Sequence, residues 1–202
     1  IIKNEELSSI LSRIPNLPFE DVPIGNSESD NLEIKKWGNF KKFSFTPKRH
    51  YEVGENIGLM NFDIATKLSG SRFVVLKGLL SKLERAIAQF MLDEHTLING
   101  YTEINVPILV KNQCLYGTGN LPKFSDDLFT AGDSHWLIPT AEVPLTNLVR
   151  DQILELNTLP MRVTSFTPCF RSEAGAAGKD TRGMLRQHQF SKVELVSIST
   201  PE

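Results

Sequence analysis

Cysteine and histidine are scarce in this 202-residue sequence, which contains two cysteines and four histidines. Cys114 and Cys169 lie far apart, and the histidines do not stand at the spacings of a zinc-binding motif. This scarcity excludes a disulfide-stapled scaffold and predicts no metal site formed by protein side chains. The cysteine usage favours a reduced chain, and we expect it in the cytoplasm.

Long apolar runs are also missing. No stretch approaches the roughly 20 apolar residues that a membrane-spanning helix needs. The first residues, Ile1 to Glu6, are polar and acidic, unlike a signal peptide. We therefore expect no membrane partner. Because the sequence lacks an initial methionine and stops at Glu202, soon after an apolar strand, it is predicted to be a piece of a longer protein.

An excess of either charge is absent, since 22 Lys and Arg face 24 Asp and Glu. A net charge of -2 argues against a protein that coats nucleic acid non-specifically, although it leaves room for a local basic patch. Hydrophobic residues at 40% and charged residues at 23% are typical of a globular protein and exclude disordered and collagen-like classes.

Hydrophobic periodicity predicts an α+β fold in which helices flank an antiparallel sheet. The expected helices span residues 1–11, 55–68, 79–99 and 141–150, and the apolar stripe expected on the third consists of Leu80, Leu83, Ile87, Phe90, Met91 and Leu97. The expected strands span residues 73–76, 101–106, 135–139, 162–171 and 187–199. The last two strands are joined by a glycine-rich loop, residues 172–186, so we expect them to form a hairpin.

Three regions follow from this pattern. Residues 1–11 are expected to be the last turns of a helix, and residues 55–202 to form the folded domain. Residues 12–54 contain several prolines and are predicted to be irregular. Their apolar side chains, such as Phe19, Trp37 and Phe40, predict that they pack on the core instead of forming a solvated tether.

The predicted hairpin gathers charged groups on one side. Residues two apart on a strand share a face, so Arg171 projects with Glu173, and Phe190 projects with Lys192 and Glu194. The loop adds Lys179, Arg182 and Arg186 to a segment whose glycines allow close approach of the backbone. This combination suits a polyphosphate ligand. The spacing matches neither a Walker loop nor a dinucleotide fingerprint, and a solvated surface hairpin remains open as the alternative.

Motif comparison narrows these alternatives. The segments TPCFRSEAG (167–175) and TRGMLRQHQFSKVE (181–194) resemble motif 2 of class II aminoacyl-tRNA synthetases, and the particular form is similar to the seryl-tRNA synthetase family. Thr140-Ala141-Glu142 resembles the serine-binding segment of that family, and residues 116–124 resemble its approach to the active site. Residues 100–107 resemble motif 1, the dimer-interface element, and residues 15–54 resemble the connection between the family's arm and its catalytic domain. The resemblance covers nearly the whole chain, and it implies that residues 1–11 end the family's coiled-coil arm and residues 55–202 form the N-terminal part of its catalytic domain.

The resemblance implies ATP-dependent activation of L-serine to seryl-adenylate, followed by transfer to tRNA(Ser). It implies that Arg171, the motif 2 arginine, is catalytic and holds the α-phosphate of ATP. The ATP site would consist of Arg171, Ser172, Glu173, Arg186 and Phe190, with Phe190 stacked on adenine and Mg²⁺ neutralising the pyrophosphate. Without the motif, core packing would be the favoured role for Phe190.

The resemblance further implies a serine site formed by Thr140, Ala141, Glu142 and Glu194, where carboxylates accept from the ammonium and hydroxyl groups. Two alternatives apply to this set. Glu142 also suits the first turn of a helix, and Glu194 also suits a surface pair with Lys192. The remaining conspicuous residues are expected to be structural; they are His188, Cys114, Cys169, Trp37 and Trp136.

The family's third motif and most of its arm are not found, so the fold is expected to be incomplete and the 202-residue chain inactive by itself. The resemblance implies that the parent protein is a homodimer through the motif 1 region. Two other functions remain open. One is a synthetase-like ligase that loads a carrier protein, and the other is a non-catalytic synthetase-like module. Threonine and proline are the next amino-acid candidates after serine.

Overall fold

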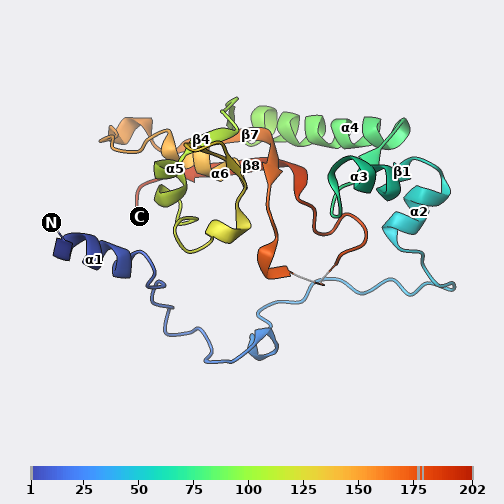
Figure 1. Cartoon of the computed structure of the whole chain (residues 1–202), viewed down its shortest axis with the longest axis horizontal. Helices are drawn as coiled ribbons and strands as arrows, with labels where there is room; N and C mark the ends of the chain where they lie inside the picture. Colours follow the sequence, from blue (N-terminus) through green and yellow to red (C-terminus); the bar gives the residue numbers. More distant parts are fainter. Residues whose placement is uncertain (1, 177, 179, 202) are drawn as a thin grey trace. The chain divides into compact units, whose positions relative to one another are not determined.

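The computed structural model describes residues 2–176, 178 and 180–201, which divide into two compact units, residues 1–48 and 49–202 (Figure 1). In the first unit, helix α1 (Ile2–Leu11) confirms the helix expected over residues 1–11. A short 3-10 helix, η1 (Glu28–Asp30), follows. The rest of residues 12–48 is irregular, as the prolines predict, and none of residues 3–48 is buried within the structure. The packing of residues 12–54 stays a prediction.

The second unit begins with two short helices, where the sequence predicts one helix over residues 55–68. Helix α2 (His50–Asn56) ends at a tight turn in which Gly58 adopts a φ of +68°. The chain then forms strand β1 (Met60–Asn61) and helix α3 (Phe62–Ser69), and the side chain of Asn61 caps α3 by accepting from the Ile64 N–H. The single-helix prediction is therefore wrong, because this turn and cap interrupt a continuous apolar spacing.

Strand β2 (Val75–Leu76) pairs antiparallel with β1 and leads into the longest helix, α4 (Leu79–Asp93). The sequence predicts a buried strand here, but both residues of β2 are only half-buried, since their partner is a two-residue strand. Helix α4 continues into a π-helical turn, η2 (Glu94–Ile98), and the helical segment ends before Gly100, as predicted.

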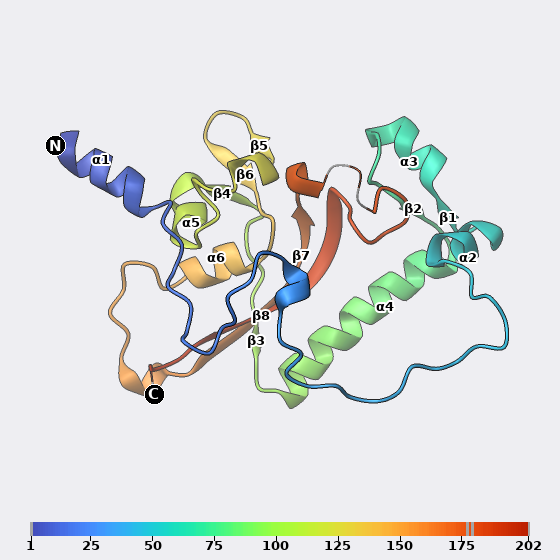
Figure 2. The ribbon, with the colours of Figure 1, turned by 90° about the horizontal axis from the view of Figure 1, so that it is seen from below.

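Helix α4 packs against the main sheet through a different face from the one predicted. The buried residues are Ala88 and Leu92, whereas Leu83, Ile87 and Phe90 of the expected apolar stripe remain 45–66% exposed. Figure 2 shows the helix running beside the long hairpin. An apolar face of α4 is therefore left uncovered by the described residues of the second unit.

The main sheet has three strands in the order β3-β7-β8. Strand β7 (Met161–Phe170) pairs antiparallel with β8 (Gln189–Ile198) over ten residues, which confirms the predicted hairpin. Strand β3 (Thr102–Glu103) pairs parallel with β7 and is shorter than the predicted strand over residues 101–106.

A second small sheet contains elements that the sequence pattern leaves unpredicted. Its order is β4 (Leu109–Lys111), β6 (His135–Leu137) and β5 (Thr130–Ala131), and β6 lies within the strand expected over residues 135–139. Helix α5 (Asn112–Gly117) contacts α6 (Glu142–Asn147), which carries Pro144 in its first turn as predicted. Further 3-10 turns are η3 (Ser125–Asp127), η4 (Leu156–Thr158) and η5 (Ala174–Ala176).

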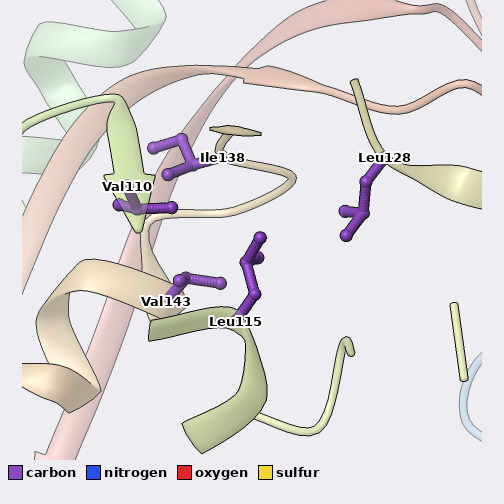
Figure 3. Close-up of a cluster of buried hydrophobic side chains, with 5 residues drawn as sticks. All are labelled: Val110, Leu115, Leu128, Ile138 and Val143. Atoms are coloured by element: carbon purple, nitrogen blue, oxygen red, sulfur yellow. The ribbon is translucent and has the colours of Figure 1, made fainter. Parts of the chain in front are cut away.

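Two apolar clusters fix the segment that joins β6 to α6. The first consists of Val110, Leu115, Leu128, Ile138 and Val143, whose side chains gather between the small sheet, α5 and α6 (Figure 3). The second consists of Val106, Ala141, Leu145 and Val163. Full burial of a Leu, Ile or Val side chain contributes about 1.5–3 kcal/mol each, so residues 138–145 are held firmly beside the main sheet.

Candidate active site

The register of the β7–β8 hairpin shows which residues lie opposite the predicted charged face. Ser165 lies opposite Glu194, Thr167 opposite Lys192, and Cys169 opposite Phe190. The three β7 residues are at most 2% exposed, whereas their β8 partners are half-buried. Phe190, Lys192 and Glu194 thus share one face, as the period of two predicts.

Arg171 directly follows β7 and is held in place by its neighbours. Its backbone N–H donates to the His188 carbonyl over 3.0 Å, and its side-chain Nε donates to the Pro139 carbonyl over 3.3 Å. The guanidinium carbon lies 5.3 Å from the centre of the Phe190 ring, within the range of a cation–π interaction. The structure therefore brings together two residues predicted for the ATP site.

Glu173 and Arg186 form the second pair at the base of the loop. Glu173 has a φ of +52°, and its Oε2 accepts from Arg186 Nη1 over 3.0 Å. Arg186 Nε also lies 3.3 Å from Asp180 Oδ2. The hydrogen bond to Glu173 and, to a smaller extent, the one to Asp180 raise the pKa of Arg186, which is always positively charged in proteins. Glu173 and Arg186, both predicted for the ATP site, are thus in contact. Asp180 is an additional partner of Arg186 that was not predicted.

Two cavities adjoin at these arginines. One, of about 380 Å³, is lined by Thr140 and Glu142, and the other, of about 430 Å³, is lined by Phe190. Both share Arg171, Glu173 and Arg186 as lining residues. Thr140 and Glu142 of the predicted serine site therefore line the first lobe, Phe190 of the predicted ATP site lines the second, and the two arginines stand at their boundary.

A hydrogen-bonded chain supports the first lobe. The Thr140 hydroxyl donates to Glu194 Oε2 over 2.8 Å and accepts from the backbone N–H of Glu142 over 3.3 Å. Lys192 Nζ lies 2.5 Å from the same Glu194 oxygen. Glu194 thus pairs with Lys192, as the structural alternative predicts, and it contacts the predicted serine-site residue Thr140 as well.

Some predicted residues lie apart from the cavities. The side chain of Ala141 is fully buried in the second apolar cluster. Ser172 donates its hydroxyl to the Asp126 carbonyl and its N–H to the Asp127 carbonyl, and it lines neither cavity. These two hydrogen bonds hold the start of the loop that joins β7 to β8. Lys179 lies outside the described residues.

The first lobe also contains residues that sequence reasoning did not assign. Asn120 and Phe124 line it, and both lie in the segment that resembles the family's approach to the active site. Asp127 lines it too, and its Oδ1 accepts from the Ala174 N–H over 2.9 Å, which holds η5 in place. No periodic pattern marks these positions, because they lie in irregular chain between short elements.

Two of the residues expected to be structural, His188 and Cys169, make contacts of that kind. His188 Nδ1 donates to the Arg171 carbonyl over 2.9 Å, and its ring lies 5.4 Å from Phe73 and 5.8 Å from Phe129. Cys169 is fully buried, and this burial raises the pKa of its thiol, while the hydrogen bond with Thr167 opposes the rise.

Among the described residues, both a metal-binding cluster and a membrane-spanning helix are absent. Residues 2–176, 178 and 180–201 contain no group of three or more His, Cys, Asp and Glu side chains that could hold a metal ion. Within the same ranges, no helix has the length and apolar content needed to cross a membrane.

Comparisons with known proteins agree with the motifs. A family model described as the tRNA synthetase class II core domain (G, H, P, S and T) matches residues 123–202. The serine–tRNA ligases of Brucella canis and Brucella suis are 61% identical over 199 residues, which make up 98% of this chain and 47% of each relative. Nearly the whole chain is therefore similar to serine–tRNA ligases, and residues 123–202 match the class II synthetase core.

Solved structures of seryl-tRNA synthetases share the fold. The enzyme of Pyrococcus horikoshii, complexed with ATP, matches with a TM-score of 0.88 and 33% identity over 96% of this chain and 48% of its own. The cytoplasmic serine–tRNA ligase of Naegleria fowleri, in complex with AMP, matches with a TM-score of 0.88 and 26% identity over 100% of this chain and 48% of its own. These matches confirm the predicted α+β class II fold, and the chain spans about half the length of these seryl-tRNA synthetases.

Proposed function

We propose that the protein containing this chain is a serine–tRNA ligase, which activates L-serine with ATP and transfers it to tRNA(Ser). The observation that carries the proposal is the pair of adjoining cavities that share Arg171, Glu173 and Arg186. A reaction between an amino acid and a nucleotide needs two such lobes that meet at a cationic boundary. The ATP and AMP complexes of the solved relatives support the same assignment.

The activation step explains why arginine stands at the boundary. A carboxylate oxygen of serine attacks the α-phosphorus of ATP, an O–P bond forms, the bond to the bridging oxygen breaks, and pyrophosphate leaves. Both reactants are anionic, so fixed positive charge and alignment supply most of the catalysis. Arg171 can bridge the carboxylate and the α-phosphate with its planar donors. Arg186 would contact the outer phosphates.

The second lobe suits the base and phosphates of ATP. Phe190 offers an aromatic face, and Arg171 lies 5.3 Å from the centre of that ring. The described residues form no cluster of three metal-ligating side chains. They fit Mg²⁺ that arrives bound to ATP, because this ion is usually held by phosphates, waters and one or two carboxylates. Glu173, the carboxylate that lines both cavities, would be its protein ligand.

The first lobe suits a small polar amino acid. Thr140 and Glu142 line it, and Glu194 is tied to Thr140. These groups can accept hydrogen bonds from an ammonium and a hydroxyl group. A site of this kind rejects analogues without the hydroxyl, because its buried polar groups would be left unpaired. Serine is therefore the substrate that we propose.

We further propose a homodimer that works in the cytoplasm. The segment predicted to mediate dimerisation, residues 100–107, follows helix α4, whose Leu83, Ile87 and Phe90 are 45–66% exposed. An uncovered apolar face of this kind is typical of an association surface. The measurement is the molar mass of the full-length protein by light scattering, where Phe90→Glu should convert a dimer into a monomer.

The test of the activity is ATP–pyrophosphate exchange by the full-length protein with each of the 20 amino acids. We expect exchange with L-serine well above that with threonine, proline or alanine. Exchange that prefers another amino acid, or none, would reject the proposal. The acceptor is tested separately with radiolabelled serine, by comparing tRNA with a carrier protein bearing a phosphopantetheine thiol. Loading of the carrier alone would favour the carrier-protein ligase.

A further inference from the structure

The start of helix α2 contacts the loop that carries Arg186. His50, the first residue of α2, accepts a hydrogen bond at Nε2 from the backbone N–H of Met184 over 2.8 Å. The two residues are 134 positions apart in the sequence. At this contact the lone pair of Nε2 faces the backbone N–H. The contact ties the loop to a helix outside the hairpin.

Gly183 allows this close contact. Its φ is +89°, and a Cβ atom at this position would stand 2.5 Å from His50 Nε2 and 2.9 Å from Tyr51 Cδ1. Real Cβ atoms essentially never approach that closely. The loop backbone therefore lies directly against the two aromatic rings at the start of α2, which no residue with a side chain would permit without displacement.

The neighbouring side chains extend the contact. Tyr51 is 6% exposed, and the guanidinium carbon of Arg182 lies 5.0 Å from the centre of its ring. Arg49, the residue directly before α2, donates from Nη1 to the Tyr51 hydroxyl over 2.9 Å and so helps to hold the ring in place. The residues on both sides of Gly183, Arg182 and Met184, are thus each contacted by a residue of α2.

We propose that His50 is a positioning residue for the ATP lobe: it fixes the backbone at Met184, two residues before Arg186, and thereby sets where the Arg186 guanidinium meets the nucleotide. The inference rests on the proposed function, because it concerns the ATP that Arg186 would bind. The side-chain partners of Arg186, Glu173 and Asp180, belong to the same loop region, and its carbonyl accepts from Arg72 Nη1 over 3.5 Å, so His50 and Arg72 anchor this part of the loop from outside.

The first test measures the hydrogen bond itself and needs no activity. In the full-length protein, hydrogen–deuterium exchange of the peptide containing Met184 is compared for wild type, His50→Leu and His50→Gln. We expect about three- to tenfold faster exchange in His50→Leu, the loss of roughly one ordinary hydrogen bond. His50→Gln should restore protection, because its amide oxygen can accept at the position of Nε2. Equal exchange in wild type and His50→Leu would overturn the proposal.

The second test measures the consequence for ATP. His50→Leu should raise the KM for ATP in the exchange reaction about three- to tenfold with little change in the KM for serine, and His50→Gln should recover most of the loss. His135→Leu is the matched control, since His135 Nδ1 lies 2.8 Å from Ser134 Oγ in the small sheet. An unchanged KM for ATP in His50→Leu, or equal rises for both substrates, would contradict a positioning role. A wild-type protein without serine-dependent exchange would reject the proposed function, while the deuterium measurement would still decide the role of His50.

Discussion

The Thr140 hydroxyl donates its proton to Glu194 Oε2 over 2.8 Å, and Lys192 Nζ lies 2.5 Å from the same oxygen. The backbone N–H of Glu142 in turn donates to Thr140 Oγ1. With its proton committed to Glu194, Thr140 can offer only a lone pair to a ligand in the first lobe. Under the proposed function, Thr140 would therefore accept a hydrogen bond from a donor such as the ammonium or hydroxyl group of serine.

Thr140→Val tests this polarity. Valine keeps the shape of the side chain but cannot accept from the substrate, and it removes one partner of Glu194. We expect the KM for serine in the exchange reaction of the full-length protein to rise about tenfold, with the KM for ATP unchanged. Thr140→Ser keeps the hydroxyl and is the matched control. Equal serine KM values for Thr140→Val and Thr140→Ser would contradict the assignment.

Arg171→Ala should remove the charge at the boundary of the two lobes. We expect the exchange rate to fall by roughly 10²–10³-fold, the usual effect of deleting a group that stabilises transition-state charge. Arg171→Lys should recover only a small part, because lysine lacks the planar pair of donors.

Arg162→Ala is the control for this variant, since Arg162 is an exposed arginine at the other end of β7. Circular dichroism should show the same fold for the Arg171→Ala, Arg171→Lys and Arg162→Ala proteins. An Arg171→Ala enzyme with near-normal exchange would remove Arg171 from the catalytic role.

Gly183→Ala tests the contact with α2 from the side of the loop. The methyl group would collide with His50 and Tyr51, and a φ of +89° is strained for any residue with a Cβ atom. We expect a local cost of about 1–3 kcal/mol, which should appear as a raised KM for ATP and faster proteolysis of the loop. Gly175→Ala lies in the same loop and meets no atom within 4 Å, so it should behave as wild type. Equivalent behaviour of the two variants would show that the close approach has no consequence.

The sequence predicts the long hairpin strands and most of the long helix well. The sequence pattern does not predict short elements, whose structure depends on tertiary contacts and turns. Strands β7 and β8 are ten residues each and carry a clear period of two, so their pairing and the face with Phe190 and Glu194 follow from the pattern. Strands of two or three residues, such as β4 and β5, are too short to show a period. The break between α2 and α3 depends on Gly58 and on the cap at Asn61, which an apolar spacing does not register.

The candidate site divides in the same way. Arg171, Glu173 and Arg186 are recognisable from motif and charge, and the structure brings them together. Asp127 and His50 act through backbone hydrogen bonds to distant parts of the loop, at separations of 47 and 134 residues. Such contacts depend on tertiary folding and leave no local signal, so sequence reasoning could not assign them.

Leu115→Ala tests the cluster that holds the segment between β6 and α6. Leu115 is fully buried among Val110, Ile138 and Val143, so truncation should leave a cavity. We expect the free energy of unfolding of the full-length protein, measured with urea, to fall by about 2–5 kcal/mol. Leu156→Ala is the control, because Leu156 is 74% exposed and should cost no more than about 0.5 kcal/mol. A Leu115→Ala protein as stable as the control would show that this cluster contributes little to stability.

Cys169 should resist alkylation in the folded protein. Its side chain is fully buried, and this burial raises the pKa of the thiol, so the reactive thiolate is a smaller fraction at any given pH. We expect iodoacetamide at pH 8 to label Cys114, which is half-buried, well before Cys169, with mass spectrometry identifying the modified peptides. Labelling of Cys169 should increase as the pH rises towards the raised pKa, and urea should remove the difference between the two thiols. Rapid labelling of Cys169 under native conditions would mean that β7 opens to solvent beside Arg171 and Phe190.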